Sequence, residues 1–199
     1  MSPFRILTVC TGNICRSPLS EIALRHYLSN LNSVEVFSAG TRALVGQPMD
    51  TQNAEIAEQR GISGSRDHVA RQLTAEQIES ADLILALARE HRRFVVELVP
   101  SATQRTFTLR EFARLAQQYS QDSPAVAPLS DVFGRSLDNF VLNVAAQRGD
   151  VRKVSSPTDD DVIDPYRLDS AVFAQQANEI LPAAEICAAF IQTNIENAY

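Results

Sequence analysis

Short apolar runs that alternate with helix-like patterns constrain the fold of this chain more than any other feature. Each run is short for a buried helix and lies next to a segment with a different apolar period. The runs occupy four stretches: FRILTV at 4–9, VEVF at 34–37, DLILAL at 82–87 and RTFTL at 105–109. Strands that alternate with helices form right-handed parallel crossovers. The sequence therefore predicts an α/β fold with a doubly wound, roughly four-stranded parallel sheet flanked by helices.

Three helices are expected between these strands. The first starts near Ser17, after which apolar residues recur at helical spacing through Leu31. The second covers 50–60 and is closed by Gly61, and the third covers about 89–98. A last helix is indicated by an apolar stripe from Phe173 to Ile195, in which Pro182 predicts a kink or a restart. This stripe should pack on the sheet.

Length and composition bound the class of protein. A chain of 199 residues is long enough for one well-buried domain, so we expect a single domain over 1–199. The net charge of -6 and the mixed charges give no basic face for nucleic acid. The chain shows no signal peptide and no apolar run near the roughly 18 residues of a membrane span. With three cysteines, too few for a disulfide framework, it is expected to be a cytoplasmic protein that does not contact membranes.

The stretch from about 117 to 161 is expected to be an insertion rather than a domain. It is polar, contains several prolines and carries a predicted helix from Ser136 to Arg148. Its acidic run at 159–161 is interpreted as a solvated loop edge. The insertion could cap a site, bind a partner or form a surface loop, and the sequence does not decide between these roles.

The loop VCTGNICRSP at 9–18 joins the first strand to the first helix. Such a loop directs backbone N–H groups and the positive end of the helix dipole at an anion. Cys10 is a candidate nucleophile because that field stabilises a thiolate, and Arg16 can hold two oxygens of a phosphate-like group. The GK[ST] element of a nucleotide P-loop is missing. Zinc is disfavoured because no cysteine or histidine pair complements Cys10 and Cys15, and Cys187 is expected to be a buried, inert side chain.

The motif VCTGNICRSPLSE at 9–21 resembles the signature of the low-molecular-weight protein tyrosine phosphatases. The resemblance extends through SAGT at 38–41, DHVARQLT at 67–74, ADLILAL at 81–87 and DPY at 164–166. It implies a phosphatase domain that needs neither a metal nor another cofactor. Cys10 would attack phosphorus to give a phosphocysteine intermediate, Arg16 would bind the phosphoryl oxygens, and Asp164 would serve as general acid.

The resemblance assigns further residues to the site. Asn13 would take a left-handed conformation held by hydrogen bonds, and Ser17 would bond the thiolate. Three groups are implied: a phosphate-binding loop of Thr11, Gly12, Asn13, Ile14, Cys15 and Ser17; a supporting network with Ser38 and His68; and a substrate slot with Leu44 and Tyr166. Phosphate, sulfate or vanadate should bind this loop. His91, in the basic stretch REHRRF, is expected to be at the surface.

The substrate is less constrained than the chemistry. Ile14 stands where the related arginine phosphatases have threonine, which favours phosphotyrosine in proteins or peptides. A protein-arginine phosphatase, a thioredoxin-coupled arsenate reductase and a non-catalytic phosphate-binding module stay open as further possibilities. The arsenate reductases need relay cysteines, and this chain has none between Cys15 and Cys187. A regulatory disulfide between Cys10 and Cys15 is geometrically plausible, although Cys15 could equally fill space under the loop.

Overall fold

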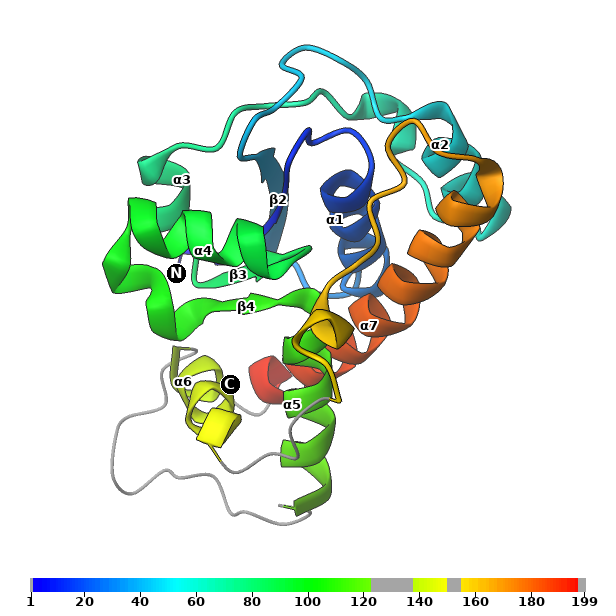
Figure 1. Ribbon diagram of the computed structural model, residues 1–199. Coiled ribbons are helices and arrows are strands. Elements are labelled where there is room, and N and C mark those ends of the chain that lie inside the picture. Colours follow the sequence, from blue (N-terminus) through cyan, green and yellow to red (C-terminus); the bar gives the residue numbers. More distant parts are fainter. Residues whose placement is uncertain (1, 123–137, 150–154, 197–199) are drawn as a thin grey trace.

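A computed structural model describes residues 2–122, 138–149 and 155–196, and its centre is a parallel four-stranded sheet (Figure 1). The strands are β1 (Phe4–Cys10), β2 (Val34–Gly40), β3 (Leu83–Ala86) and β4 (Thr106–Thr108). Their order is β2-β1-β3-β4, with all three pairings parallel. The predicted α/β class and parallel sheet are confirmed. The carboxyl end of β1, at Cys10, pairs with Gly40 of β2.

Helices cover both faces of the sheet, as the near-continuous apolar strands require. Successive β1 side chains alternate between two cores, with Ile6 and Cys10 on one face and Leu7 and Val9 on the other. The first face packs against α1 (Arg16–Tyr27), α2 (Thr51–Gln59), α5 (Leu109–Asp122) and α7 (Ser170–Glu196). The second face packs against α3 (Ala75–Glu79), α4 (Arg89–Leu98) and the 3-10 helix η2 (Pro100–Arg105).

The predicted helix boundaries agree closely with the structure for α2 and α4. Gly61 follows α2 with a φ of +72°, a left-handed conformation that glycine adopts without strain. The C-terminal stripe is buried along α7, which packs between α1 and α5. Pro182 lies inside this helix and does not restart it. Packing on both neighbouring helices outweighs the hydrogen bond that proline removes.

Residues 138–149 of the insertion lie far from the carboxyl ends of the strands. Its helix α6 (Asp138–Ala146) places the Phe140 ring 5.3 Å from the Phe4 ring. Phe4 begins β1 and Cys10 ends it, so the two ends of this strand are about 20 Å apart. Next to α6, in η3 (Gln147–Gly149), Arg148 lies 4.1 Å over the Phe107 ring of β4. Residues 138–149 therefore brace the sheet and do not cap a site at Cys10. The predicted helix start at Ser136 lies outside the described residues.

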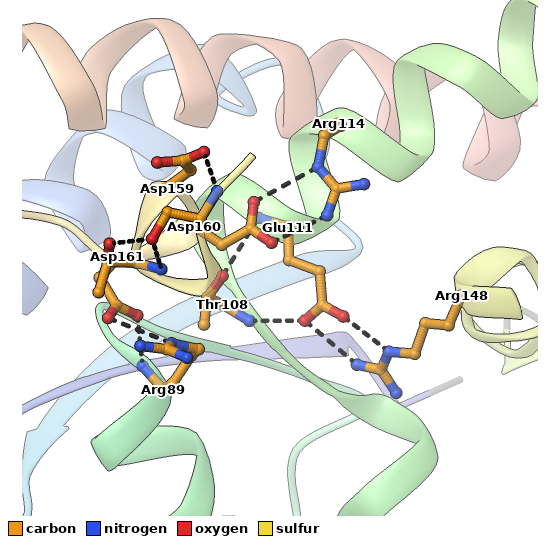
Figure 2. A network of polar contacts seen from close by, with 10 residues as sticks. Arg89, Thr108, Glu111, Arg114, Arg148, Asp159, Asp160 and Asp161 are labelled. Atoms are coloured by element: carbon orange, nitrogen blue, oxygen red, sulfur yellow. Dashed lines mark hydrogen bonds and ion pairs between the residues drawn. The ribbon is translucent and has the colours of Figure 1, made fainter. Parts of the chain in front are cut away.

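The acidic run is not a solvated edge, contrary to the expectation from sequence. It ends a 3-10 helix, η4 (Pro157–Asp160), and two of its carboxylates form ion pairs (Figure 2). Asp160 pairs with Arg114 of α5, and Asp161 pairs with Arg89 of α4. The partners lie 46 and 72 residues away in sequence, so composition alone could not reveal them.

Among the helices that the structure describes, none combines the length and apolarity that a membrane span requires.

Candidate active site

The loop from Cys10 to α1 is built around the Cys10 sulfur. Cys10 is the last residue of β1 and is 2% exposed. Its Sγ lies 3.0 Å from the Ser17 hydroxyl and accepts a hydrogen bond from the Asn13 amide at 3.3 Å. Asn13 Nδ2 donates to the same hydroxyl at 2.9 Å, so the hydroxyl proton of Ser17 is available for the sulfur.

The loop carbonyls point outward, which turns the intervening amides inward. Four of the loop carbonyls accept hydrogen bonds of 2.8–2.9 Å from the segment that follows β2. The acceptors are Cys10, Thr11, Gly12 and Ile14, and the donors are the amides of Thr41, Arg42, Leu44 and Asp50 in that order. Within the described residues, the amides of Gly12, Ile14 and Cys15 donate to no protein group. Such a ring of free N–H groups is an anion-binding nest.

Arg16 and Asp164 meet across the mouth of this nest. The Arg16 side chain is 4% exposed, and its Nη2 lies 2.7 Å from Oδ2 of Asp164, which is 52% exposed. Arg16 also donates to the carbonyl of Val162 at 3.4 Å and to the Thr11 hydroxyl at 3.5 Å. Three groups thus hold the guanidinium in place beside the loop.

A slot leads from solvent to Cys10. Its walls combine loop residues with side chains from two distant segments. The lining residues are Cys10, Thr11, Gly12, Ile14, Cys15, Arg16, Arg42, Leu44, Asp164 and Tyr166. Leu44 and Tyr166, which the resemblance assigns to a substrate slot, are partly exposed in this lining. Arg42 was not predicted, because nothing in RALVG distinguishes a slot arginine from a surface one.

Asn13 organises the underside of the loop. It is fully buried and has a φ of +55°, the left-handed conformation expected from the sequence. Its Nδ2 donates to Ser38 Oγ at 2.8 Å as well as to Ser17, and its Oδ1 accepts from the Arg71 amide at 2.8 Å. The structure therefore brings together Asn13, Ser17 and Ser38.

His68 joins the same network through a ring nitrogen. Its Nε2 lies 2.7 Å from the Asn13 carbonyl, which only accepts, so Nε2 carries a proton. Burial lowers the pKa of His68, against the opposing effects of this hydrogen bond and of Glu21. The neutral ring is the form that fits this buried position.

Glu21 is a network residue that sequence reasoning missed. Its side chain is 3% exposed, accepts from the Ser38 hydroxyl and forms an ion pair with Arg25 at 2.7 Å. A signal was present: Glu21 lies four residues after Ser17 and so shares its face of α1.

His91 is not at the surface, which corrects the expectation from sequence. It is 1% exposed, and its Nε2 lies 2.8 Å from the Thr11 hydroxyl. Burial, and then the positive charge of Arg16, lowers its pKa to about 3. The available signal was the four-residue spacing to Val95, which is also buried on α4.

The three cysteines are free and buried. Burial is the main cause that raises the pKa of both Cys15 and Cys187, and nearby Asp50 adds to the shift at Cys15. Cys187 packs in the core, as predicted. The part of the chain that the structure describes holds no group of three or more His, Cys, Asp or Glu residues placed to bind a metal ion.

Comparison with known proteins identifies the family. The family model described as low molecular weight phosphotyrosine protein phosphatase matches residues 5–128. The chain belongs to this family. It is similar to the low molecular weight protein-tyrosine-phosphatase Etp of Escherichia coli K12, with 45% identity over 101 residues. That match covers 51% of this chain and 66% of Etp, just under two thirds of the relative's length.

Solved structures extend the similarity over nearly the whole chain. The YwlE arginine phosphatase from Geobacillus stearothermophilus superposes with a TM-score of 0.70 at 26% identity, covering 99% of this chain and 98% of that one. Vibrio vulnificus Wzb, in complex with benzylphosphonate, superposes with a TM-score of 0.64 at 26% identity, covering 93% and 97%. The similar proteins thus include one named a protein-tyrosine-phosphatase and one named an arginine phosphatase.

Proposed function

We propose that this protein is a metal-independent cysteine phosphatase that hydrolyses phosphotyrosine in proteins or peptides. The observation that carries the proposal is the placement of the Cys10 sulfur under a nest of free amides, with Arg16 and Asp164 paired across the mouth. A phosphoryl group has three oxygens to be held, and the nest and the guanidinium supply donors for all of them.

The first chemical step transfers the phosphoryl group to Cys10. The Cys10 thiolate forms an S–P bond as the bond from phosphorus to the phenolic oxygen breaks. An incoming phosphate offers Arg16 two oxygens and replaces Asp164 as its partner. Asp164, released from this ion pair at the open side of the slot, takes up a proton from solvent and then donates it to the departing phenolic oxygen.

The second step releases phosphate. Asp164 takes a proton from a water molecule, the water oxygen attacks phosphorus, and the S–P bond breaks to regenerate the thiolate. The Ser17 hydroxyl, 3.0 Å from Sγ, stabilises the sulfur as it leaves phosphorus. The products are inorganic phosphate and free enzyme. Phosphate, sulfate and vanadate should bind the same loop as competitive inhibitors.

Phosphotyrosine is the preferred substrate class because of the slot walls. Ile14, Leu44 and the Tyr166 ring present apolar surfaces that fit a phenyl ring. Phosphoarginine is the second candidate, favoured by the structural similarity to YwlE. Its guanidinium would need polar partners in the slot, and Ile14 offers none.

Arsenate reduction and phosphate binding without catalysis fit the site less well. Cys187 is buried in the core on α7, where it is not accessible to act as a disulfide relay. This burial counts against arsenate reduction. A pure binding module would need neither the thiol nor Asp164. The three free thiols also fit the reducing cytoplasm, which we retain as the proposed location.

Hydrolysis of two matched peptides tests the proposal. One carries phosphotyrosine and the other phosphoarginine in the same flanking sequence, and both are assayed in EDTA. We expect kcat/KM to favour phosphotyrosine by at least about 100-fold, since the substrate must fill an apolar slot. An Ile14→Thr variant is the matched control and should narrow this ratio. Preference of the wild type for phosphoarginine would assign the protein to the second candidate.

A further inference from the structure

The segment that carries Asp164 is fixed at its start. The Val162 amide donates to the carbonyl of Leu87, the residue after β3, at 2.9 Å. The Ile163 amide donates to Glu179 Oε2 of α7 at 2.9 Å. Asp164 itself is half exposed, and when a phosphate replaces it at Arg16 its remaining support is the chain around it.

Asp161 anchors this segment to α4. Its Oδ1 accepts a hydrogen bond from the Arg89 amide at 2.7 Å, and its Oδ2 lies 3.3 Å from Arg89 Nε. The N-cap residue of α4 is Ala88, whose side chain cannot accept a hydrogen bond. Asp161 therefore caps α4 from a distant part of the chain and places a negative charge at the positive end of the helix. Its carbonyl also accepts from Arg110 at 2.9 Å.

Asp160 anchors the same segment to α5. Both of its carboxylate oxygens face Arg114, at 2.8 Å from Nη2 and 3.4 Å from Nε (Figure 2). The Asp160 side chain is only 14% exposed, and a bidentate pair of this kind restricts orientation as well as distance. Asp159 bonds back to the Ser156 amide and so closes η4 upon itself.

Both anchors attach to helices that leave the sheet beside the site. Helix α4 follows β3, and α5 follows β4, so Asp160 and Asp161 are tied to the same sheet edge that bears Cys10. Figure 1 shows η4 next to β4 and α5, with the following chain running past α1 toward α2. The distance from Asp161 to Asp164 is three residues, at most about 10 Å of chain. A shift at the anchors is therefore transmitted to the carboxyl group.

We infer that Asp160 and Asp161 are positioning residues that hold Asp164 over the leaving group. This inference rests on the proposed function and adds residues to its machinery. Displacing a reacting group by about 1 Å can reduce a rate by about 100-fold. The anchors act on one chemical event, the protonation of the departing oxygen. Their loss should therefore lower the rate only for substrates whose leaving group needs that proton.

The test compares leaving groups. Phenyl phosphate needs the proton, whereas 2,4-dinitrophenyl phosphate releases a stable anion and does not. The quantity to measure is kcat/KM, because it covers the steps through departure of the leaving group. For Asp161→Ala we expect a loss of about 10-fold on phenyl phosphate and less than about 2-fold on dinitrophenyl phosphate. Asp161→Asn keeps an acceptor for the Arg89 amide and should recover most of the loss.

A double-variant cycle separates positioning from general destabilisation. In an Asp164→Ala background, Asp161→Ala should cause no further loss on phenyl phosphate, because no acid is left to position. Glu97→Gln is the matched control, since it removes an exposed ion pair with Arg93 from the same helix. Circular dichroism checks that each variant is folded.

Equal losses on both substrates, or additive losses in the Asp164→Ala background, would overturn the inference while leaving the phosphatase activity in place. No turnover of either substrate by the folded, reduced wild type would instead overturn the proposed function.

Discussion

The buried His91 ring should make the free energy of unfolding depend on pH. The ring is buried beside the phosphate-binding loop, with Nε2 2.8 Å from the Thr11 hydroxyl. Its Nδ1 has no partner among the described residues, so a protonated ring would leave a buried N–H unsatisfied. The Glu90 carboxylate lies 3.3 Å from Nε2 but is 71% exposed, and water screens its charge. Folding therefore requires the neutral ring.

The cost of this requirement depends on pH. The pKa of His91 is about 3 in the folded protein and roughly 6.5 when the chain is unfolded. Between these values the unfolded chain binds a proton that the folded protein does not bind. The contribution of His91 to stability is therefore complete above about pH 6.5 and declines as the pH falls toward 3. From pH 7.5 to 5 the decline is about 2 kcal/mol.

Urea unfolding of the wild type and of His91→Gln measures this decline. Glutamine does not titrate, and its amide can still reach the Thr11 hydroxyl. Other groups titrate alike in both proteins, so the difference in unfolding free energy isolates His91. Between pH 7.5 and 5 the wild type should lose about 2 kcal/mol more than the variant. Parallel pH profiles for the two proteins would show that His91 is not buried as a neutral ring.

Further predictions concern the loop and its slot. Gly40→Ala would place a Cβ 2.5 Å from the Thr11 carbonyl oxygen and so displace the loop. The variant should stay folded by circular dichroism and lose about 100-fold in kcat/KM. Wild-type kinetics of this variant would contradict the prediction. Peroxide-treated wild type should regain activity with dithiothreitol, because a Cys10–Cys15 disulfide protects Cys10. In Cys15→Ser the Cys10 thiol should over-oxidise, and the activity should not return. Equal recovery of activity by both proteins would exclude the disulfide. Arg42→Glu should reduce the preference for acidic over basic phosphotyrosine peptides about 5-fold, measured as a kcat/KM ratio; an unchanged ratio would remove Arg42 from substrate recognition.

The sheet could be predicted because its strands are buried on both faces. Segments such as 4–9 and 82–87 are nearly all apolar, and helical spacing begins near Ser17, after the loop that follows the first of them. The loop residues could also be predicted, since Cys10 through Ser17 are contiguous in sequence. Asp164 could be assigned only through the resemblance to a family, because it lies 148 residues from Arg16 in the sequence.

The missed residues share one physical cause. Asp160 and Asp161 look like a solvated acidic run until their arginine partners on α4 and α5 are placed beside them. His91 sits in a basic stretch, and only the turn of the helix carries it inward. Charged side chains are usually solvated, so burial by long-range pairing is not visible in local composition.

The proposed mechanism depends on covalent phosphorylation of Cys10. The most direct measurement is mass spectrometry of the peptide containing Cys10 after acid quenching of a reaction with a phosphotyrosine peptide in EDTA. We expect Cys10 of the wild type to carry one added phosphoryl group, and Cys10→Ala neither to carry it nor to turn over substrate. Turnover by Cys10→Ala, or a phosphoryl group found on another residue, would rule out Cys10 as the nucleophile.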